Sequence, residues 1–235
     1  MKSNCHYFSM NTPTTSTISS VSPTGSLFAV HDNSIYQYTH TSDNHIISMD
    51  SLPTITFTAN WLVICSALYL QNVRLDTIGS LSTSCKLPAH RLELVTTLNG
   101  VDFYNDSKGT TSAATLAALD KLKGRPIIVL LGGIGKGVDR GPLIRDIKHR
   151  IKAIICFGKE HEELARQCHL HEVCHTATAT LKQAITIAMQ TAIPGDQVVL
   201  SPAGASFDEF KNYEERGNFF KEQIYSAVVN EVQTC

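Results

Sequence analysis

The chain has 235 residues, of which 43% are apolar and 17% charged, and its formal net charge is −1 at pH 7. That length is enough for one large or two small domains with a sizeable core. The nearly neutral charge gives no support for a nucleic-acid partner, and no apolar segment is long enough to insert into a membrane.

The N-terminal residues and the cysteines both favour a cytoplasmic protein. Residues 1–7 are mostly polar and lack the apolar segment of a secretory signal. Of the seven cysteines, Cys65 and Cys156 lie within apolar runs. Buried free thiols in a reducing compartment are the simplest interpretation of that pattern.

The segment from Cys168 to His175 is rich in cysteine and histidine, the residue types that bind zinc. Alternation along a loop and a short strand would point these side chains to opposite faces. No second Cys/His pair supplies the usual zinc spacing. We therefore expect no metal site in this chain.

The N-terminal part has a weak structural pattern. Residues 10–24 are rich in Ser, Thr and Pro, so we expect residues 1–24 to be disordered or a linker. Short β-like pieces separated by polar turns then predict an edge hairpin or a meander of a larger sheet. These pieces are Leu27–Val30, Ser34–Tyr38, His45–Met49 and Thr54–Phe57.

The pattern becomes helical near residue 60. Apolar residues between Leu62 and Leu70 predict a mostly buried helix over residues 60–71, with Asn60 near its N-terminus. A second helix is expected over residues 75–81. The stretch Leu87-Pro88-Ala89-His90-Arg91 that follows has the character of an interdomain joint.

Beyond the joint, strands alternate with helices, which predicts an α/β fold with a doubly wound, mainly parallel sheet. The pair Asn99-Gly100 between two β runs predicts a hairpin of residues 92–97 and 101–104. The continuous apolar run at residues 126–131 predicts a central parallel strand. The remaining predictions are a helix at 110–122, strand 153–157 with helix 160–168, strand 172–175 with helix 179–192, strand 197–200 with a helix beginning near Phe207, and a final helix at 213–232.

Two polar turns follow strands of this predicted sheet, at residues 105–110 and 131–137. In an open α/β sheet, ligands bind at the carboxyl ends of the strands. The turns present Asp106, Lys108, Lys136, hydroxyls and glycines. Lysine charge together with backbone N–H groups that glycine leaves accessible suits an anionic ligand.

Four ordered motifs carry a resemblance to a known family. They are LPAHR at 87–91, NDSKGT at 105–110, LGGIGK at 131–136 and LSPAGASFDEFKNYEERG at 200–217. Spread over roughly the last 150 residues, they resemble the C-terminal part of the Mur ligases. The DSK-x-T element resembles the branch of that family that adds D-glutamate to UDP-N-acetylmuramoyl-L-alanine in peptidoglycan precursor synthesis.

The resemblance implies a Rossmann-like C-terminal ligase domain at residues 87–235, preceded at residues 25–86 by the end of a central ATPase domain. It also implies D-glutamate and UDP-N-acetylmuramoyl-L-alanine as substrates, with ATP and Mg²⁺ as cofactors. Such ligation through an acyl phosphate depends on positioning and charge. No residue of the motifs is a convincing nucleophile or general acid or base.

The resemblance places D-glutamate on five residues. Lys108 and Thr110 would hold phosphate or the amino acid, and Lys136 would pair with one carboxylate. Ser206, expected at a helix N-terminus, would offer its hydroxyl and backbone N–H to the other carboxylate. Tyr213 stands where the family has phenylalanine, which is a mild change if the contact is made by the backbone N–H.

The resemblance implies nucleotide contacts for Asn60, Arg91 and Asp106. By residue type alone, Asn60 and Asp106 also suit helix caps, and Arg91 also suits an exposed surface. The family has His-Asn just before the asparagine, whereas this chain has Thr56-Phe57.

A larger departure from the family is the missing P-loop. No Gly-rich turn ending in Gly-Lys-Ser/Thr occurs before residue 60, and Gly135-Lys136-Gly137 supplies no hydroxyl after its lysine. Room for a UDP-binding N-terminal domain is also lacking. We therefore expect the last third or half of such a ligase, with residues 88–235 folding alone and residues 1–60 unable to do so.

Two function classes remain open from the sequence. The chain is either a D-glutamate ligase, with missing domains supplied by a companion chain, or an inactive fragment or binding module that holds D-glutamate or a partner. An unrelated Rossmann-type nucleotide binder is a weaker alternative, because the turn after Leu131 lacks G-x-G-x-x-G.

Overall fold

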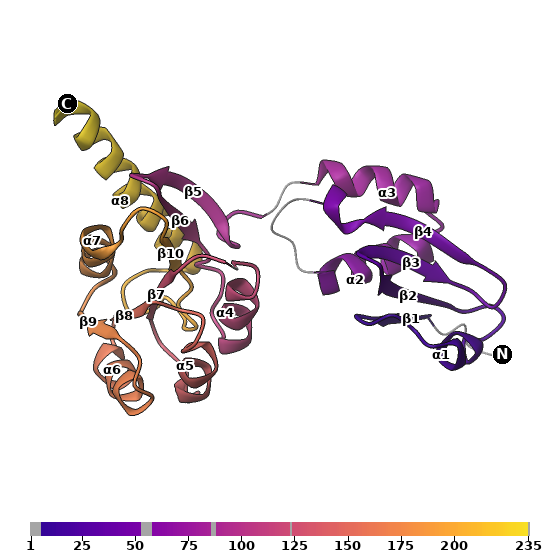
Figure 1. Cartoon of the computed structure of the whole chain (residues 1–235), viewed down its shortest axis with the longest axis horizontal. Helices are drawn as coiled ribbons and strands as arrows, with labels where there is room; N and C mark the ends of the chain where they lie inside the picture. Colours follow the sequence, from indigo (N-terminus) through magenta and orange to yellow (C-terminus); the bar gives the residue numbers. More distant parts are fainter. Residues whose placement is uncertain (1–5, 53–57, 86–87, 123, 235) are drawn as a thin grey trace. The chain divides into compact units, whose positions relative to one another are not determined.

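A computed structural model describes residues 6–52, 58–85, 88–122 and 124–234. The chain divides into two compact units, Met1–Leu87 and Pro88–Cys235 (Figure 1). Each unit has a sheet and a hydrophobic core of its own.

Unit 1 contains a four-stranded sheet of order β1-β2-β3-β4. Its strands are β1 (His6–Ser9), β2 (Ser26–His31), β3 (Ser34–Tyr38) and β4 (Asp43–Ser48), and a 3-10 turn, η1 (Met49–Ser51), follows β4. Strand β1 runs parallel to β2, whereas β2, β3 and β4 form an antiparallel meander. The predicted meander is thus confirmed for its first three pieces, and Thr54–Phe57 lies outside the described residues.

Helices cover the sheet of unit 1. They are α1 (Thr15–Ser19), α2 (Thr58–Leu70) and α3 (Leu75–Ser84). The core under α2 and α3 joins Phe28 and Ile35 of the sheet to Trp61, Leu62 and Ile78. Both helices were predicted, but α2 is not mostly buried as expected, since Ile64 and Leu70 are exposed.

The structure differs from the sequence expectation over residues 1–24. The described part of that stretch contains β1 and α1, where disorder or a linker was expected. Val21 is buried against Leu27 and Tyr38, and Ile18 of α1 packs beside them. Two apolar side chains thus anchor a segment whose Ser/Thr/Pro composition is typical of disorder.

Unit 2 contains a six-stranded sheet of order β5-β6-β10-β7-β8-β9. Its strands are β5 (Glu93–Leu98), β6 (Val101–Asn105), β7 (Ile127–Gly132), β8 (Ala153–Phe157), β9 (His175–Ala177) and β10 (Gln197–Leu200). Only the β5–β6 pairing is antiparallel among the described strands of this sheet. The turn of that hairpin has φ 51° at Asn99 and 75° at Gly100, as expected for Asn-Gly. The predicted doubly wound, mainly parallel sheet is confirmed.

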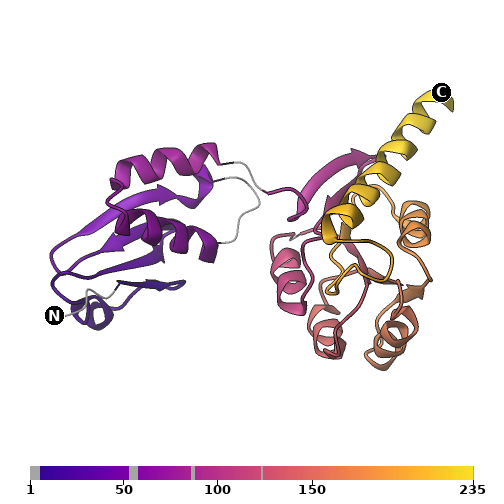
Figure 2. The ribbon, with the colours of Figure 1, turned by 180° about the vertical axis from the view of Figure 1, so that it is seen from behind.

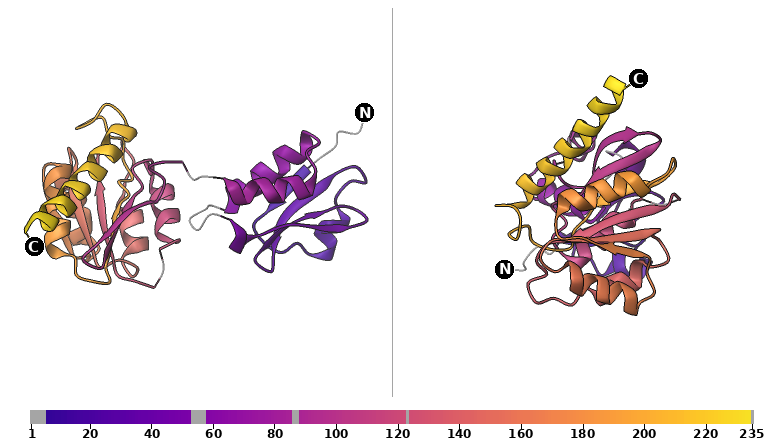
Figure 3. Two further views of the ribbon diagram at one scale, coloured as in Figure 1. Left: turned by 90° about the horizontal axis from the view of Figure 1, so that it is seen from above. Right: turned by 90° about the vertical axis from the view of Figure 1, so that its left-hand side faces the viewer.

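Helices lie on both faces of this sheet (Figures 1 and 3). Helices α4 (Ser112–Leu119), α5 (Gly141–Ile147) and α6 (His161–Leu170) pack side by side, while α7 (Leu181–Thr191) packs against α8 (Tyr213–Thr234). Helix α8 runs along β5 and β6 (Figure 2), with an ion pair between Lys221 and Glu93.

Three local predictions for unit 2 were wrong. Helix α5 was not predicted, although Pro142 lies in its first turn, where proline is favoured. Strand β9 begins at His175, three residues later than expected. No helix begins near Phe207, because the chain forms a turn there and α8 begins only at Tyr213.

Candidate functional site

The carboxyl ends of three neighbouring strands bring together the two polar turns and the loop after Leu200. Strands β6, β10 and β7 are adjacent and parallel, so the loops after Asn105, Leu200 and Gly132 leave the sheet at one edge. Ile134 and Ala205 exchange backbone hydrogen bonds of 2.9 and 2.8 Å, which join the second and third loops directly. This edge was predicted as the ligand site.

Asp106 lies buried at this edge and organises the turn that contains it. It is 3% exposed, and its carboxylate accepts hydrogen bonds from Leu92 N–H (3.1 Å) and Ser201 Oγ (2.7 Å). Burial raises the pKa of Asp106 to about 6, although these two hydrogen bonds act in the opposite direction. A Cβ on Gly109 would lie 2.4 Å from Asp106 Oδ2, so the turn requires glycine there.

Arg216 of α8 joins two of the three loops. It is 0% exposed, and its guanidinium donates to Ser107 Oγ (3.0 Å), Ser107 O (2.8 Å) and Gly204 O (3.0 Å). Burial lowers the pKa of Arg216 to about 10, so it stays charged at neutral pH. Sequence analysis missed this residue, because an arginine in a Glu-Glu-Arg-Gly run resembles an exposed helical residue.

Lys108 and Tyr213 lie together at the start of α8. Lys108 Nζ is 5.5 Å from the centroid of the Tyr213 ring, within the range of a cation–π interaction. The ring of His90 packs edge-on against the same tyrosine, and burial lowers the pKa of His90. Ser107 Oγ donates to Tyr213 O at 2.8 Å, which fixes the start of α8 against the turn.

Thr110 and Ser206 complete the loops after β6 and β10. Thr110 is half-buried and precedes Thr111, the N-cap of α4, so the cap is not Asp106. Ser206 is 3% exposed, and its carbonyl accepts from the N–H groups of Glu209 and Phe210. Ser206 is therefore a buried residue at the start of a turn whose Phe207 is exposed, and its predicted place at a helix N-terminus was wrong.

Lys136 is exposed in the Gly-rich turn, residues 132–137. It has φ 54°, a left-handed conformation that is unusual for a residue with a side chain. Gly133 has φ 72°, and a Cβ there would lie 2.2 Å from Ala205 O. The close approach of the loop after β10 thus fixes one end of the turn that presents Lys136.

The remaining predicted nucleotide residues lie in different units. Arg91 is half-buried in unit 2, close enough to Asp106 for its charge to lower the pKa of that carboxyl. Asn60 is exposed in the first turn of α2 in unit 1. The Thr56-Phe57 departure lies outside the described residues.

Comparison with known proteins identifies this domain. Residues 90–204 match the family described as Mur ligase, glutamate ligase domain. Unit 2 therefore belongs to the Mur ligase family. The chain is 39% identical over 171 residues to UDP-N-acetylmuramoylalanine-D-glutamate ligase of Pseudothermotoga lettingae, and 35% identical over 200 residues to that of a Thermoanaerobacter species.

The chain spans less than half the length of these curated relatives. The two alignments cover 73% and 83% of this chain, but only 40% and 44% of the relatives.

Solved structures show the same fold at low identity. A murein peptide ligase of Psychrobacter arcticus matches with a TM-score of 0.60 at 12% identity, covering 93% of this chain and 46% of that one. UDP-N-acetylmuramate-alanine ligase of Thermotoga maritima matches with a TM-score of 0.61 at 9% identity, covering 86% and 48%.

Mur ligases use ATP and Mg²⁺, and in this Mur ligase domain one N–H of the Gly-rich turn is already bound to a carboxylate. The N–H of Gly135 donates to both carboxylate oxygens of Glu160, each at 3.1 Å. A carboxylate of the protein thus occupies this donor, and the turn has one backbone N–H fewer to offer an anion. Among the described residues, no group of three or more His, Cys, Asp and Glu side chains is placed to hold a metal ion.

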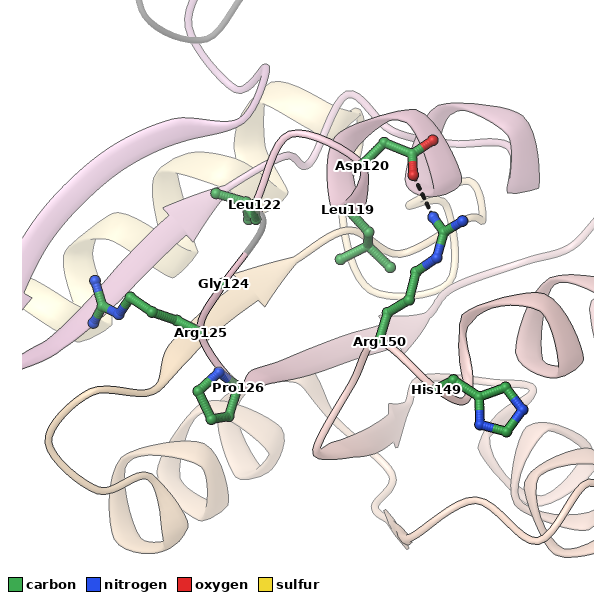
Figure 4. A pocket seen from close by; sticks show the side chains of 8 residues that line it. All are labelled: Leu119, Asp120, Leu122, Gly124, Arg125, Pro126, His149 and Arg150. Atoms are coloured by element: carbon green, nitrogen blue, oxygen red, sulfur yellow. Dashed lines mark hydrogen bonds and ion pairs between the residues drawn. The ribbon is translucent and has the colours of Figure 1, made fainter.

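A cavity of about 590 Å³ lies at the other edge of the Mur ligase domain, near the amino end of β7 (Figure 4). It is lined by Leu119, Asp120, Leu122, Gly124, Arg125, Pro126, His149 and Arg150. Asp120 pairs with Arg150 across its rim, and Arg125 pairs with Asp102. None of the predicted site residues lines this cavity.

No described helix is both long and apolar enough to cross a bilayer.

Proposed function

We propose that the Mur ligase domain of this chain binds D-glutamate, as part of a ligase that adds D-glutamate to UDP-N-acetylmuramoyl-L-alanine. The observation that carries the proposal is the placement of Lys108 and Lys136 in turns at one edge of the sheet, after β6 and β7. The relatives named as D-glutamate ligases support the substrate class.

The chemistry of the edge suits a dicarboxylate amine. Lys136 would pair with one carboxylate of D-glutamate, and its exposed position leaves the ammonium accessible. Lys108, held over the Tyr213 ring, and Thr110 would contact the other end of the substrate or the acyl phosphate. Ser206 and Tyr213 would contribute hydroxyl and backbone N–H groups. These residues orient and stabilise charge, so they lower the barrier without a proton donor or nucleophile.

The nucleotide half of the reaction is assigned to residues outside the Gly-rich turn. Asn60, Arg91 and Asp106 are proposed to contact the nucleotide. Asp106 is suited to a ribose hydroxyl only through its remaining lone pairs, since each oxygen already accepts one hydrogen bond. The triphosphate, Mg²⁺ and UDP-sugar sites would come from sequence equivalent to the rest of the relatives, and the complete reaction would take place in the cytoplasm.

The second candidate function is a binding module without catalysis. It is favoured by the Glu160 carboxylate, which occupies the N–H of Gly135 in the Gly-rich turn. In that case the domain binds D-glutamate or a partner protein and performs no ligation.

An assay of ligation separates the two functions. Purified chain is incubated with ATP, Mg²⁺, UDP-N-acetylmuramoyl-L-alanine and labelled D-glutamate, beside the Lys108→Ala and Lys136→Ala variants. Turnover that both substitutions abolish assigns catalysis to this chain. Binding of D-glutamate without turnover assigns the binding function, and absence of both contradicts the proposal.

A further inference from the structure

The Gly-rich turn is held by two side chains that the D-glutamate reaction does not use. Arg140, at the N-cap of α5, is 3% exposed, and its Nη1 donates to Gly132 O at 3.0 Å. Its Nη2 pairs with Oε2 of Glu160, which lies between β8 and α6. Glu160 in turn accepts from Gly135 N–H. One ion pair thus connects the first and middle residues of the turn to the next βα loop.

The backbone of this turn needs such a restraint. Glycines at 133, 135 and 137 leave the chain free to adopt many conformations. Lys136 between them has φ 54°, which costs about 1 kcal/mol or more for a residue with a side chain. The hydrogen bonds to Glu160 fix the Ile134–Gly135 peptide, and the N–H of Val138 donates to Gly135 O at 3.0 Å, which holds the next peptide, directly before Lys136. The direction in which Lys136 leaves the turn is therefore coupled to Glu160.

The buried charge of Arg140 depends on Glu160 for its compensation. A buried arginine without a counter-charge is strongly destabilising, and Glu160 is the carboxylate in contact with Arg140. Glu160 itself is only partly covered, with 33% of its side chain exposed. A change at Glu160 can therefore alter the turn, while the glutamate side chain is not needed to fill the core.

We propose that Glu160 and Arg140 form a clamp that holds the Gly-rich turn in the conformation that presents Lys136 to a substrate carboxylate. This inference rests on the proposed role of Lys136 in D-glutamate binding. Neither member of the clamp touches the substrate, so both are positioning residues.

The test compares Glu160→Ala and Glu160→Gln with Glu162→Ala, an exposed glutamate in the first turn of α6. Site-resolved amide hydrogen exchange is measured by NMR for residues 133–138 and for β7. In Glu160→Ala we expect exchange at Gly135 to rise about tenfold or more beyond any rise in β7, because the acceptor of that N–H is lost, whereas the uncompensated charge of Arg140 affects the whole domain. Glu160→Gln keeps an acceptor oxygen and is expected to retain part of the protection.

A titration with D-glutamate tests the link to Lys136. Glu160→Ala is expected to weaken binding by about five- to tenfold, Glu160→Gln by less, and Glu162→Ala not at all. In a Lys136→Ala background the Glu160→Ala substitution should have no further effect, since the two residues act on one contact.

The outcomes separate the clamp from the proposed function. Unchanged exchange at Gly135 in both Glu160 variants overturns the clamp. Faster exchange with unchanged affinity, in a protein whose Lys136→Ala variant loses binding, overturns the positioning role. If wild-type protein does not bind D-glutamate, or binds it equally well without Lys136, the proposed function fails and exchange alone decides whether the clamp exists.

Discussion

At the scale of single residues, the carboxyl edge of unit 2 uses buried and exposed charges differently. Asp106 and Arg216 are buried, and their polar atoms are occupied by the loops that they hold. Lys136 is exposed in a turn, with its ammonium accessible to solvent. Buried charges thus fix the loops, and the exposed cation Lys136 is available to a ligand.

The stability of the protein should depend on pH through Asp106. Burial raises its pKa from 3.8 to about 6, so the folded state binds this proton more tightly than the unfolded state. The stability that protonated Asp106 adds to the folded state is fully present below pH 4 and is lost as the pH rises through 6. At neutral pH this loss lowers the free energy of unfolding by about 3 kcal/mol. Asp106→Asn should remove that loss. Urea unfolding of both proteins between pH 4 and 7.5 tests this, and parallel pH profiles would contradict it.

Arg216→Lys should destabilise unit 2 by about 2–3 kcal/mol, since one ammonium cannot replace three donors aimed at Ser107 and Gly204. The measurement is chemical denaturation followed by far-UV circular dichroism. Arg166→Lys is the control, because Arg166 forms an exposed pair with Glu163. Equal effects of the two substitutions would mean that the buried hydrogen bonds contribute little.

At the scale of elements, the sheet and most helices of unit 2 could be predicted from sequence, because they depend on local patterns. Continuous apolar runs mark β7 and β8, and Asn99-Gly100 marks the hairpin. The contacts of Arg216 and Glu160 could not be predicted in this way. Arg216 binds Ser107 across 109 positions of sequence, and such a pairing leaves no periodic signal. The turn near Ser206 was mistaken for a helix for the same reason, since tertiary contacts determine it.

Two glycines of one turn offer a matched comparison. Gly133 and Gly137 have φ 72° and 77°, but a Cβ at Gly133 would meet Ala205 O, whereas at Gly137 nothing lies within 4 Å. Gly137→Ala should therefore cost only the backbone penalty of about 1–2 kcal/mol, and Gly133→Ala clearly more. Thermal unfolding of both variants measures the difference. Equal costs would show that the loops after β7 and β10 separate freely.

At the scale of the whole molecule, the two units have independent cores. The core of unit 1 extends from Phe28 to Ile78 and includes the single tryptophan, Trp61. Residues 1–60 lack the α2 and α3 side chains that complete this core. The Mur ligase domain, by contrast, contains its whole sheet between β5 and β10.

Limited proteolysis should therefore give a resistant fragment that contains residues 88–235. No stable fragment ending near residue 60 is expected, because its hydrophobic face would be uncovered. Mass spectrometry of the fragments, with tryptophan fluorescence as the report on unit 1, checks both statements. A resistant fragment limited to the first 60 residues would contradict this division.

The most direct measurement of the central claim is a calorimetric titration of D-glutamate into the folded chain, into Lys136→Ala and into Lys121→Ala. Lys121 is an exposed lysine in the loop that connects α4 to the amino end of β7. If the carboxyl edge is a D-glutamate site, wild type and Lys121→Ala bind alike and Lys136→Ala binds at least about tenfold more weakly. Equal binding by all three proteins, or none by the wild type, would contradict the assignment of this edge to D-glutamate.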